Sequence, residues 1–218
     1  MEHRLALIIA NPASRDGTLA VDWGENEDRI GAVLAKQGGA DFKVETQTLW
    51  TRIESPGANL IREALITQSN KGKPFTDLII AGGDGTVAEA MQGLFEEPAS
   101  PFSLAPKLLQ ATSGLKIAIV PSGRGNDFFK SVSNDRFSSF EGKRRRAFEL
   151  LQSGRYRNTD LLWCSWSSGG RILVNVASFG FPGLVVERVK DRAGWIGRSA
   201  IGKSAWAYIA QTATSFFD

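Results

Sequence analysis

Short apolar runs alternate with longer amphipathic stretches along roughly the first half of the chain. Four runs have the length and apolar or β-rich character of strands, at residues 4–10, 43–49, 77–81 and 116–120. Between them, apolar residues recur three and four positions apart, which predicts helices over residues 26–36, after residue 57 and after residue 85. Residues 96–115 are rich in proline and serine, and we expect a loop there. Alternating strands and helices predict an α/β fold, a mostly parallel sheet with helices on both faces.

The pattern changes near Gly154. Residues 156–166 and 171–179 are strand-like and are separated by two serines and two glycines, which predicts an antiparallel hairpin. Residues 199–216 then carry apolar side chains at helical spacing. We therefore expect one α/β domain over residues 1–154, followed at residues 155–218 by the beginning of a β-rich second domain.

Composition narrows the class of protein. Hydrophobic residues make up 42% and charged residues 22% of the 218 residues, which excludes disordered and fibrous classes. No apolar run approaches the ~20 residues that span a bilayer, and the single Cys164 cannot form an internal disulfide. We expect a soluble, cytoplasmic protein. The net charge of +3 is uneven, because residues 155–218 alone carry +4 and four of the six tryptophans.

The strongest motif follows the third predicted strand: Gly82, Gly83, Asp84, Gly85 and Thr86. Ligands bind at the carboxyl ends of strands in parallel sheets. Glycines there let backbone N–H groups approach phosphate oxygens, and the next helix adds a partial positive charge. A carboxylate in such a loop is costly unless it serves a metal or a proton, so Asp84 is the candidate general base or Mg²⁺-linked group. The alternative is a plain strand-to-helix turn in which Asp84 caps the helix.

A second glycine-rich turn follows the fourth predicted strand and contains Gly123, Arg124, Gly125, Asn126 and Asp127. It does not complete a GxGxxG pattern, because Phe128 stands at the third glycine position. Its place beside the first motif suggests that the two turns line one crevice. A turn without a ligand is the alternative interpretation.

Three other features carry less weight. Residues 197–204 match the GxxxxGK[ST] pattern of a P-loop, but a charged stretch precedes them, so we interpret them as a basic linker. The basic run at residues 143–146 is typical of a solvated helix face, with contact to acidic lipid headgroups as the alternative. We expect the C-terminal tryptophans in a core rather than on a lipid-facing surface. The sequence shows no Cys/His metal cluster, no nucleophile elbow and no nucleic-acid-binding signature.

The motifs together resemble the diacylglycerol kinase catalytic-domain family, which includes bacterial soluble lipid kinases and has sphingosine and ceramide kinases as relatives. The resemblance lies in residues 11–14, 82–86, 121–129 and 175–181, and residues 202–208 resemble the start of a family helix. It implies a nucleotide-binding α/β domain, a C-terminal β-sandwich, and ATP- and Mg²⁺-dependent phosphorylation of a lipid hydroxyl.

The resemblance also implies roles for particular residues. ATP would be held by Asn11, Thr51, Gly82, Gly83, Asp84, Gly85, Thr86, Gly123, Arg124, Gly125, Asn126 and Asp127. Asp84 would activate or orient the acceptor hydroxyl, with Glu89 on the next helical turn as a helper. The metal ligands are not identified. The implied partners are ATP and a lipid, with peripheral contact to the inner membrane face and no nucleic acid; a homodimer stays open.

Two departures from the family pattern stand out. Arg124 replaces a small residue, commonly threonine, and its guanidinium could bind phosphate or crowd the nucleotide. The family also continues past residue 218, so we expect most of the sandwich, a metal site and a late acidic residue to be missing from this chain. Two alternatives therefore remain: an NAD kinase, which shares the GGDGT turn, and a nucleotide-binding or regulatory protein without catalysis.

Overall fold

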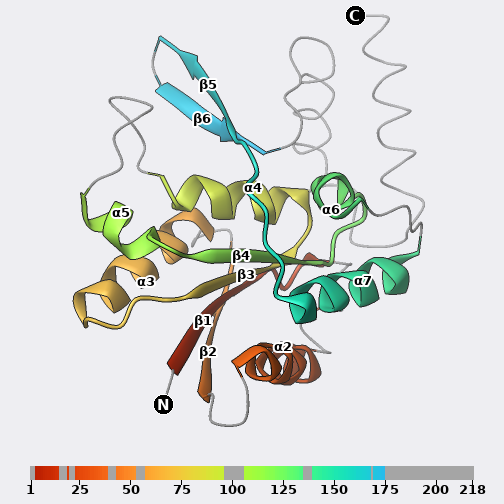
Figure 1. Cartoon of the computed structure of the whole chain (residues 1–218). Helices are drawn as coiled ribbons and strands as arrows, with labels where there is room; N and C mark the ends of the chain where they lie inside the picture. Colours follow the sequence, from red (N-terminus) through yellow and green to blue (C-terminus); the bar gives the residue numbers. More distant parts are fainter. Residues whose placement is uncertain are drawn as a thin grey trace, which may run out of the picture. The chain divides into compact units, whose positions relative to one another are not determined.

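The computed structural model describes residues 3–14, 19, 23–38, 43–52, 57–95, 106–134, 139–167 and 169–174. One sheet has the strand order β2-β1-β3-β4, and every neighbouring pair is parallel (Figure 1). Its strands are β1 (His3–Ala10), β2 (Lys43–Trp50), β3 (Asp77–Gly82) and β4 (Lys116–Pro121). The four predicted strands and their parallel arrangement are confirmed.

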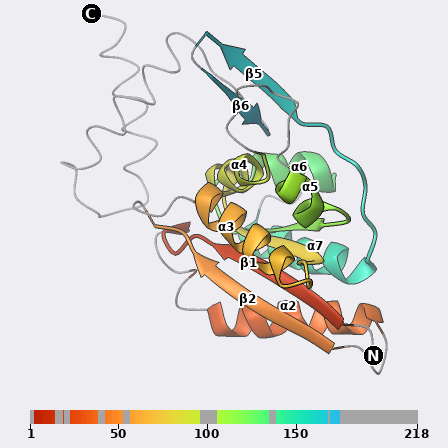
Figure 2. The same cartoon turned by 90° about the vertical axis from the view of Figure 1, so that its left-hand side faces the viewer.

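Helices cover both faces of this sheet (Figures 1 and 2). One face carries α2 (Trp23–Gly38) and α7 (Phe140–Ser153). The other carries α3 (Gly57–Asn70), α4 (Asp84–Gly93), α5 (Pro106–Thr112) and α6 (Asp127–Ser133). The predicted α/β class is therefore confirmed. No helix in the described part of the chain is both long enough and apolar enough to cross a bilayer.

Alternate residues of the central strands belong to two separate cores. Leu7 and Ile80 pack in the core beneath α3 to α6, whereas Ile8 and Ile79 pack in the core beneath α2 and α7. All four side chains are completely buried. Full burial of each contributes about 1.5–3 kcal/mol, so the two apolar faces of the sheet hold the helices in place. This explains why both central strands are nearly continuous in apolar residues.

Helix α5 corrects the expectation of a loop throughout residues 96–115. Proline occupies the first position of α5, where its fixed φ suits a helix and its missing N–H is not needed. Leu108 and Ala111 of α5 are buried in the core with α3. Proline at this place begins the helix, so its presence was misleading as evidence for a loop.

An antiparallel hairpin follows, formed by β5 (Leu162–Trp166) and β6 (Gly169–Leu173), which confirms the predicted hairpin. The first strand begins at residue 162 rather than 156, and side chains hold the segment before it. Arg157, for example, donates to the carbonyl of Ser131 at 3.3 Å. Trp166 is 53% exposed, so the expectation that it belongs to a core is wrong. The remainder of the second predicted strand, the predicted helix at 199–216 and the motifs at 175–181, 197–204 and 202–208 lie outside the described residues.

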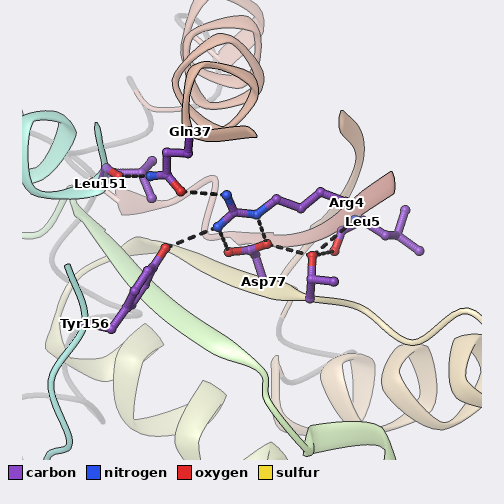
Figure 3. Close-up of polar contacts among 7 residues, drawn as sticks. Arg4, Leu5, Gln37, Asp77, Leu151 and Tyr156 are labelled. Carbon is purple, nitrogen blue, oxygen red and sulfur yellow. Dashed lines mark hydrogen bonds and ion pairs between the residues drawn. The ribbon is translucent and has the colours of Figure 1, made fainter. Parts of the chain in front are cut away.

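A polar cluster around a buried ion pair closes the amino ends of the central strands (Figure 3). The guanidinium of Arg4 in β1 pairs with both carboxylate oxygens of Asp77 in β3, each at 2.5 Å. It also donates to Gln37 of α2 at 2.6 Å and to the hydroxyl of Tyr156 at 3.3 Å. The Asp77 carboxylate raises the pKa of Arg4, while burial and the same carboxylate raise the pKa of Tyr156. This cluster fixes residues 155–161 to the edge of the sheet opposite the glycine turns.

Candidate functional site

The predicted binding residues gather where the parallel strands end. The segments after β1, β3 and β4 lie at the same edge of the sheet, because these strands run in the same direction. Backbone hydrogen bonds connect these three segments. The N–H of Asn11 donates to the carbonyl of Ala81 at 3.1 Å, and that of Ser122 donates to the carbonyl of Gly82 at 2.9 Å. The structure therefore brings together three turns that are far apart in the sequence.

Gly83 and Gly123 place the two glycine turns in direct backbone contact. A Cβ atom at Gly123 would lie only 2.4 Å from the Cα of Gly83, and one at Gly83 would lie 3.0 Å from the Cα of Gly123. Gly82 is equally restricted, since its Cβ would come within 2.4 Å of the Thr86 side chain. These glycines are thus required by packing within the protein, independently of any approach to phosphate.

Asp84 begins α4, yet its carboxylate caps a different helix. Oδ1 accepts a hydrogen bond from the backbone N–H of Phe128 at 2.9 Å, and Oδ2 accepts one from that of Asp127 at 3.1 Å. These N–H groups lie at the start of α6, where the helix itself offers them no acceptor. The side chain of the N-cap residue, Asn126, makes no capping hydrogen bond to them. Each carboxylate oxygen keeps a lone pair that could face a ligand. Asp84 therefore stabilises α6 through these two hydrogen bonds, and its carboxylate can still accept a proton or bind a ligand.

Asn126 shapes the second turn from within. Its backbone has a φ of 53°, in the left-handed region that asparagine tolerates. Its side chain accepts from the N–H of Gly123 at 2.9 Å and donates to the carbonyl of the same residue at 2.6 Å. Asn126 is only 3% exposed, whereas Arg124 is exposed. The side chain of Asn126 thus holds the turn closed around its glycines.

Gly125 lies close to two carboxylates. A Cβ atom at Gly125 would lie 3.1 Å from Oδ2 of Asp84 and 3.2 Å from Oδ2 of Asp127. Asp127 also forms an exposed ion pair with Lys130 at 2.7 Å. Among the residues that the structure describes, no three His, Cys, Asp or Glu side chains group together as a metal site. The two aspartates beside Gly125 are thus the carboxylates nearest to the contact between the turns.

The remaining predicted residues connect the turns to helices. The amide of Asn11 donates to the Thr86 hydroxyl at 3.1 Å, which joins the segment after β1 to α4. Thr51 follows β2 and is buried at the same edge. Glu89 is exposed, and its carboxylate accepts from the N–H of Gly57 at 3.2 Å, at the start of α3. The predicted residues therefore lie in the turns at the strand ends or in the first two turns of the helices that follow.

The sequence analysis missed Lys143. We expected the basic run at residues 143–146 to form a solvated helix face, but Lys143 is only 5% exposed and its Nζ lies 3.5 Å from the carbonyl oxygen of Gly125. Lys143 shares the inner face of α7 with Ala147 and Leu151, at four-residue spacing. That spacing was the available signal, and the neighbouring arginines concealed it.

An apolar groove lies beside the turns. It has a volume of about 700 Å³ and runs along β4 between α6 and α7, with residues 155–159 on its border. Phe128 and Phe129, directly after the second turn, contribute to its lining. The groove adjoins the candidate site but does not contain the glycine turns, so it does not mark the phosphate-binding position.

The chain is similar to a known protein family and to solved structures. The family model named "Diacylglycerol kinase catalytic domain" matches residues 6–164. No curated protein matches the chain. Two similar solved structures, both assigned as diacylglycerol kinases, come from Bacillus anthracis str. Sterne. The first has a TM-score of 0.45 and 20% identity, over 72% of this chain and 44% of that chain. The second has 0.41 and 19%, over 72% and 42%.

This chain therefore spans less than half the length of those two structures. The family match covers well over half of the present chain and includes all three turns at the strand ends. The chain belongs to the diacylglycerol kinase catalytic-domain family.

Proposed function

We propose that this chain carries the nucleotide-binding and phosphoryl-transfer part of an ATP-dependent lipid kinase. The observation that supports it best is the position of Asp84, whose carboxylate lies between two glycine turns in backbone contact. A potential proton acceptor and a phosphate-binding type of loop thus share one edge of the sheet. Membership of the kinase family supports the same assignment.

In this proposal the ATP phosphates rest on the backbone of residues 82–86 and 123–127. Phosphoryl transfer depends mainly on positioning and electrostatics, and a rigid, glycine-lined edge supplies the positioning. The hydroxyl oxygen of the lipid forms a bond to the γ-phosphorus while the bond from that phosphorus to the bridging oxygen of ADP breaks. Asp84 orients the hydroxyl and accepts its proton.

The carboxylates of Asp84 and Asp127, which both lie close to Gly125, fit a nucleotide-bound Mg²⁺. This ion commonly takes one or two carboxylates and completes its shell with phosphate oxygens and water. When bound, it would neutralise negative charge on the phosphates. Glu89 is placed one helical turn further along α4, and its bond to Gly57 makes it a helper in positioning α3 against α4.

Transfer of label from γ-labelled ATP to diacylglycerol or a sphingoid base in mixed micelles tests the proposal directly. We expect transfer by the wild-type chain and a loss of about 10²-fold or more in Asp84→Asn. Glu45→Gln is the control, because it neutralises one exposed carboxylate near the amino end of β2, and it should keep most of the activity. Normal transfer by a folded Asp84→Asn would remove Asp84 from the proposed role.

Other acceptors in this assay, together with a binding measurement, separate the alternatives. Label transfer to NAD and to no lipid would favour an NAD kinase. Calorimetric binding of ATP with no transfer to any of these acceptors would favour a nucleotide-binding protein without catalysis. A lipid acceptor also requires contact with a membrane surface, which sedimentation with anionic phospholipid vesicles measures.

A further inference from the structure

Lys143 is a buried cation in the first helical turns of α7. The residue is 5% exposed, and its ammonium lies 3.5 Å from the carbonyl oxygen of Gly125 in the second glycine turn. The next three basic residues have other partners: Arg144 donates to Asn26 of α2, and Arg145 and Arg146 pair with Glu149 at 3.8 and 3.4 Å. Within the described part of the chain, no carboxylate lies within ion-pair distance of Lys143.

Three independent effects make this position of the Lys143 ammonium unfavourable in free energy. A buried ammonium is unfavourable unless it is paired, and a carbonyl at 3.5 Å is at the outer limit of a hydrogen bond. Lysine near a helix N-terminus also opposes the helix dipole, which favours anions there. Finally, ordering a long side chain costs conformational entropy. A purely structural position on the inner face of α7 would be filled more stably by an apolar side chain.

The place of the ammonium indicates what offsets these costs. Gly125 lies close to the Asp84 and Asp127 carboxylates and belongs to the turn that contacts Gly83. Lys143 therefore brings a fixed positive charge to the edge where the phosphates are proposed to bind. It approaches from α7, on the opposite face of the sheet from α4 and α6.

We propose that Lys143 is an anion-binding residue that contacts a phosphate group of the nucleotide bound at the two glycine turns. This inference rests on the proposed function and adds to it a cation that belongs to neither turn. Lysine suits the role because its ammonium acts as a compact charge that can serve several phosphate oxygens.

The test compares Lys143→Met and Lys143→Arg with the wild-type chain, using calorimetry with ATP, inorganic phosphate and adenosine. We expect Lys143→Met to weaken ATP binding about tenfold or more, because a charge-assisted hydrogen bond is lost. Adenosine affinity should stay unchanged, and Lys143→Arg should recover part of the ATP affinity. Inorganic phosphate separates a general anion site, which would bind it strongly, from a site that needs the nucleotide.

Arg145→Met is the matched control, since it removes a cation from the same run at a position whose side chain is 67% exposed, and it should leave ATP affinity unchanged. Urea unfolding of each variant checks folding; Lys143→Met should be as stable as the wild type. Equal ATP affinity in wild type and Lys143→Met would overturn the inference while leaving the proposed function intact. Absence of ATP binding by the wild-type chain would instead overturn both.

Discussion

Asp84 and Phe128 are 44 positions apart, and the carboxylate Oδ1 of the first accepts a 2.9 Å hydrogen bond from the backbone N–H of the second. Asp84 thus belongs to α4 through its backbone and stabilises α6 through its side chain. The group proposed to accept a proton also holds together the two turns on which the nucleotide is proposed to rest. Experiments on Asp84 must therefore separate loss of the cap from loss of the chemistry.

The first prediction concerns stability. Asp84→Ala removes the acceptors for the N–H groups of Asp127 and Phe128, and the free energy of unfolding should fall by about 1–2 kcal/mol, as for the loss of a helix cap. Asp84→Asn keeps one side-chain oxygen and should lose less than half as much. Urea unfolding of the three chains measures both effects. Equal stability of Asp84→Ala and the wild type would show that the cap contributes nothing.

The second prediction concerns the backbone contact between the turns. Gly123→Ala should destabilise the chain by about 1–3 kcal/mol, because the new Cβ would lie 2.4 Å from the Cα of Gly83 and backbone cannot move aside easily. Gly85→Ala is the matched control in the other turn, since a Cβ there meets nothing within 4 Å. Its free energy of unfolding should stay within about 0.5 kcal/mol of the wild type. A neutral Gly123→Ala would mean that the turns are not in contact.

Local pattern was sufficient to predict the sheet. The central strands are so strongly apolar that residues 4–10 and 77–81 could only be buried strands, and parallel order followed from the helices between them. Once the order was parallel, the two glycine turns had to meet at one edge. The glycines and Asp84 were therefore predictable as neighbours, though not as chemical partners.

The unpredicted features all depend on contacts distant in the sequence or on side-chain direction. No local signal links Asp84 to the N–H groups of α6, because the capping rules apply within one helix. Asn126 resembles a ligand-binding residue in sequence, yet its amide closes its own turn. Lys143 resembles its neighbouring arginines in sequence, and only its four-residue spacing from the buried residues Ala147 and Leu151 of α7 distinguishes it.

The third prediction concerns the buried pair at the other end of the sheet. Arg4→Met leaves the Asp77 carboxylate, 1% exposed, without its guanidinium, and should cost about 3–5 kcal/mol of unfolding free energy. The double variant Arg4→Met/Asp77→Asn should be more stable than Arg4→Met, because it removes the unpaired charge. Lys43→Met is the control, since its ion pair with Glu45 is exposed and should contribute less than about 1 kcal/mol. Additive effects of the two core substitutions would contradict the pairing.

The last prediction concerns alkaline pH and Tyr156, whose hydroxyl lies 3.3 Å from Arg4. Burial, with the Asp77 carboxylate, raises the pKa of Tyr156 in the folded chain, whereas in the unfolded chain its pKa stays near 10. Above that pH the unfolded state binds fewer protons than the folded state, so stability must fall as pH rises towards the folded pKa. The Tyr156→Phe variant has no hydroxyl group that can ionise at this position. Wild type should therefore be the more stable chain at about pH 8, where the bond to Arg4 is intact, and should lose that advantage as the pH rises above about 10 towards the folded pKa. Urea unfolding at several pH values measures the difference, and curves that stay parallel for the two chains would show that Tyr156 ionises equally in both states.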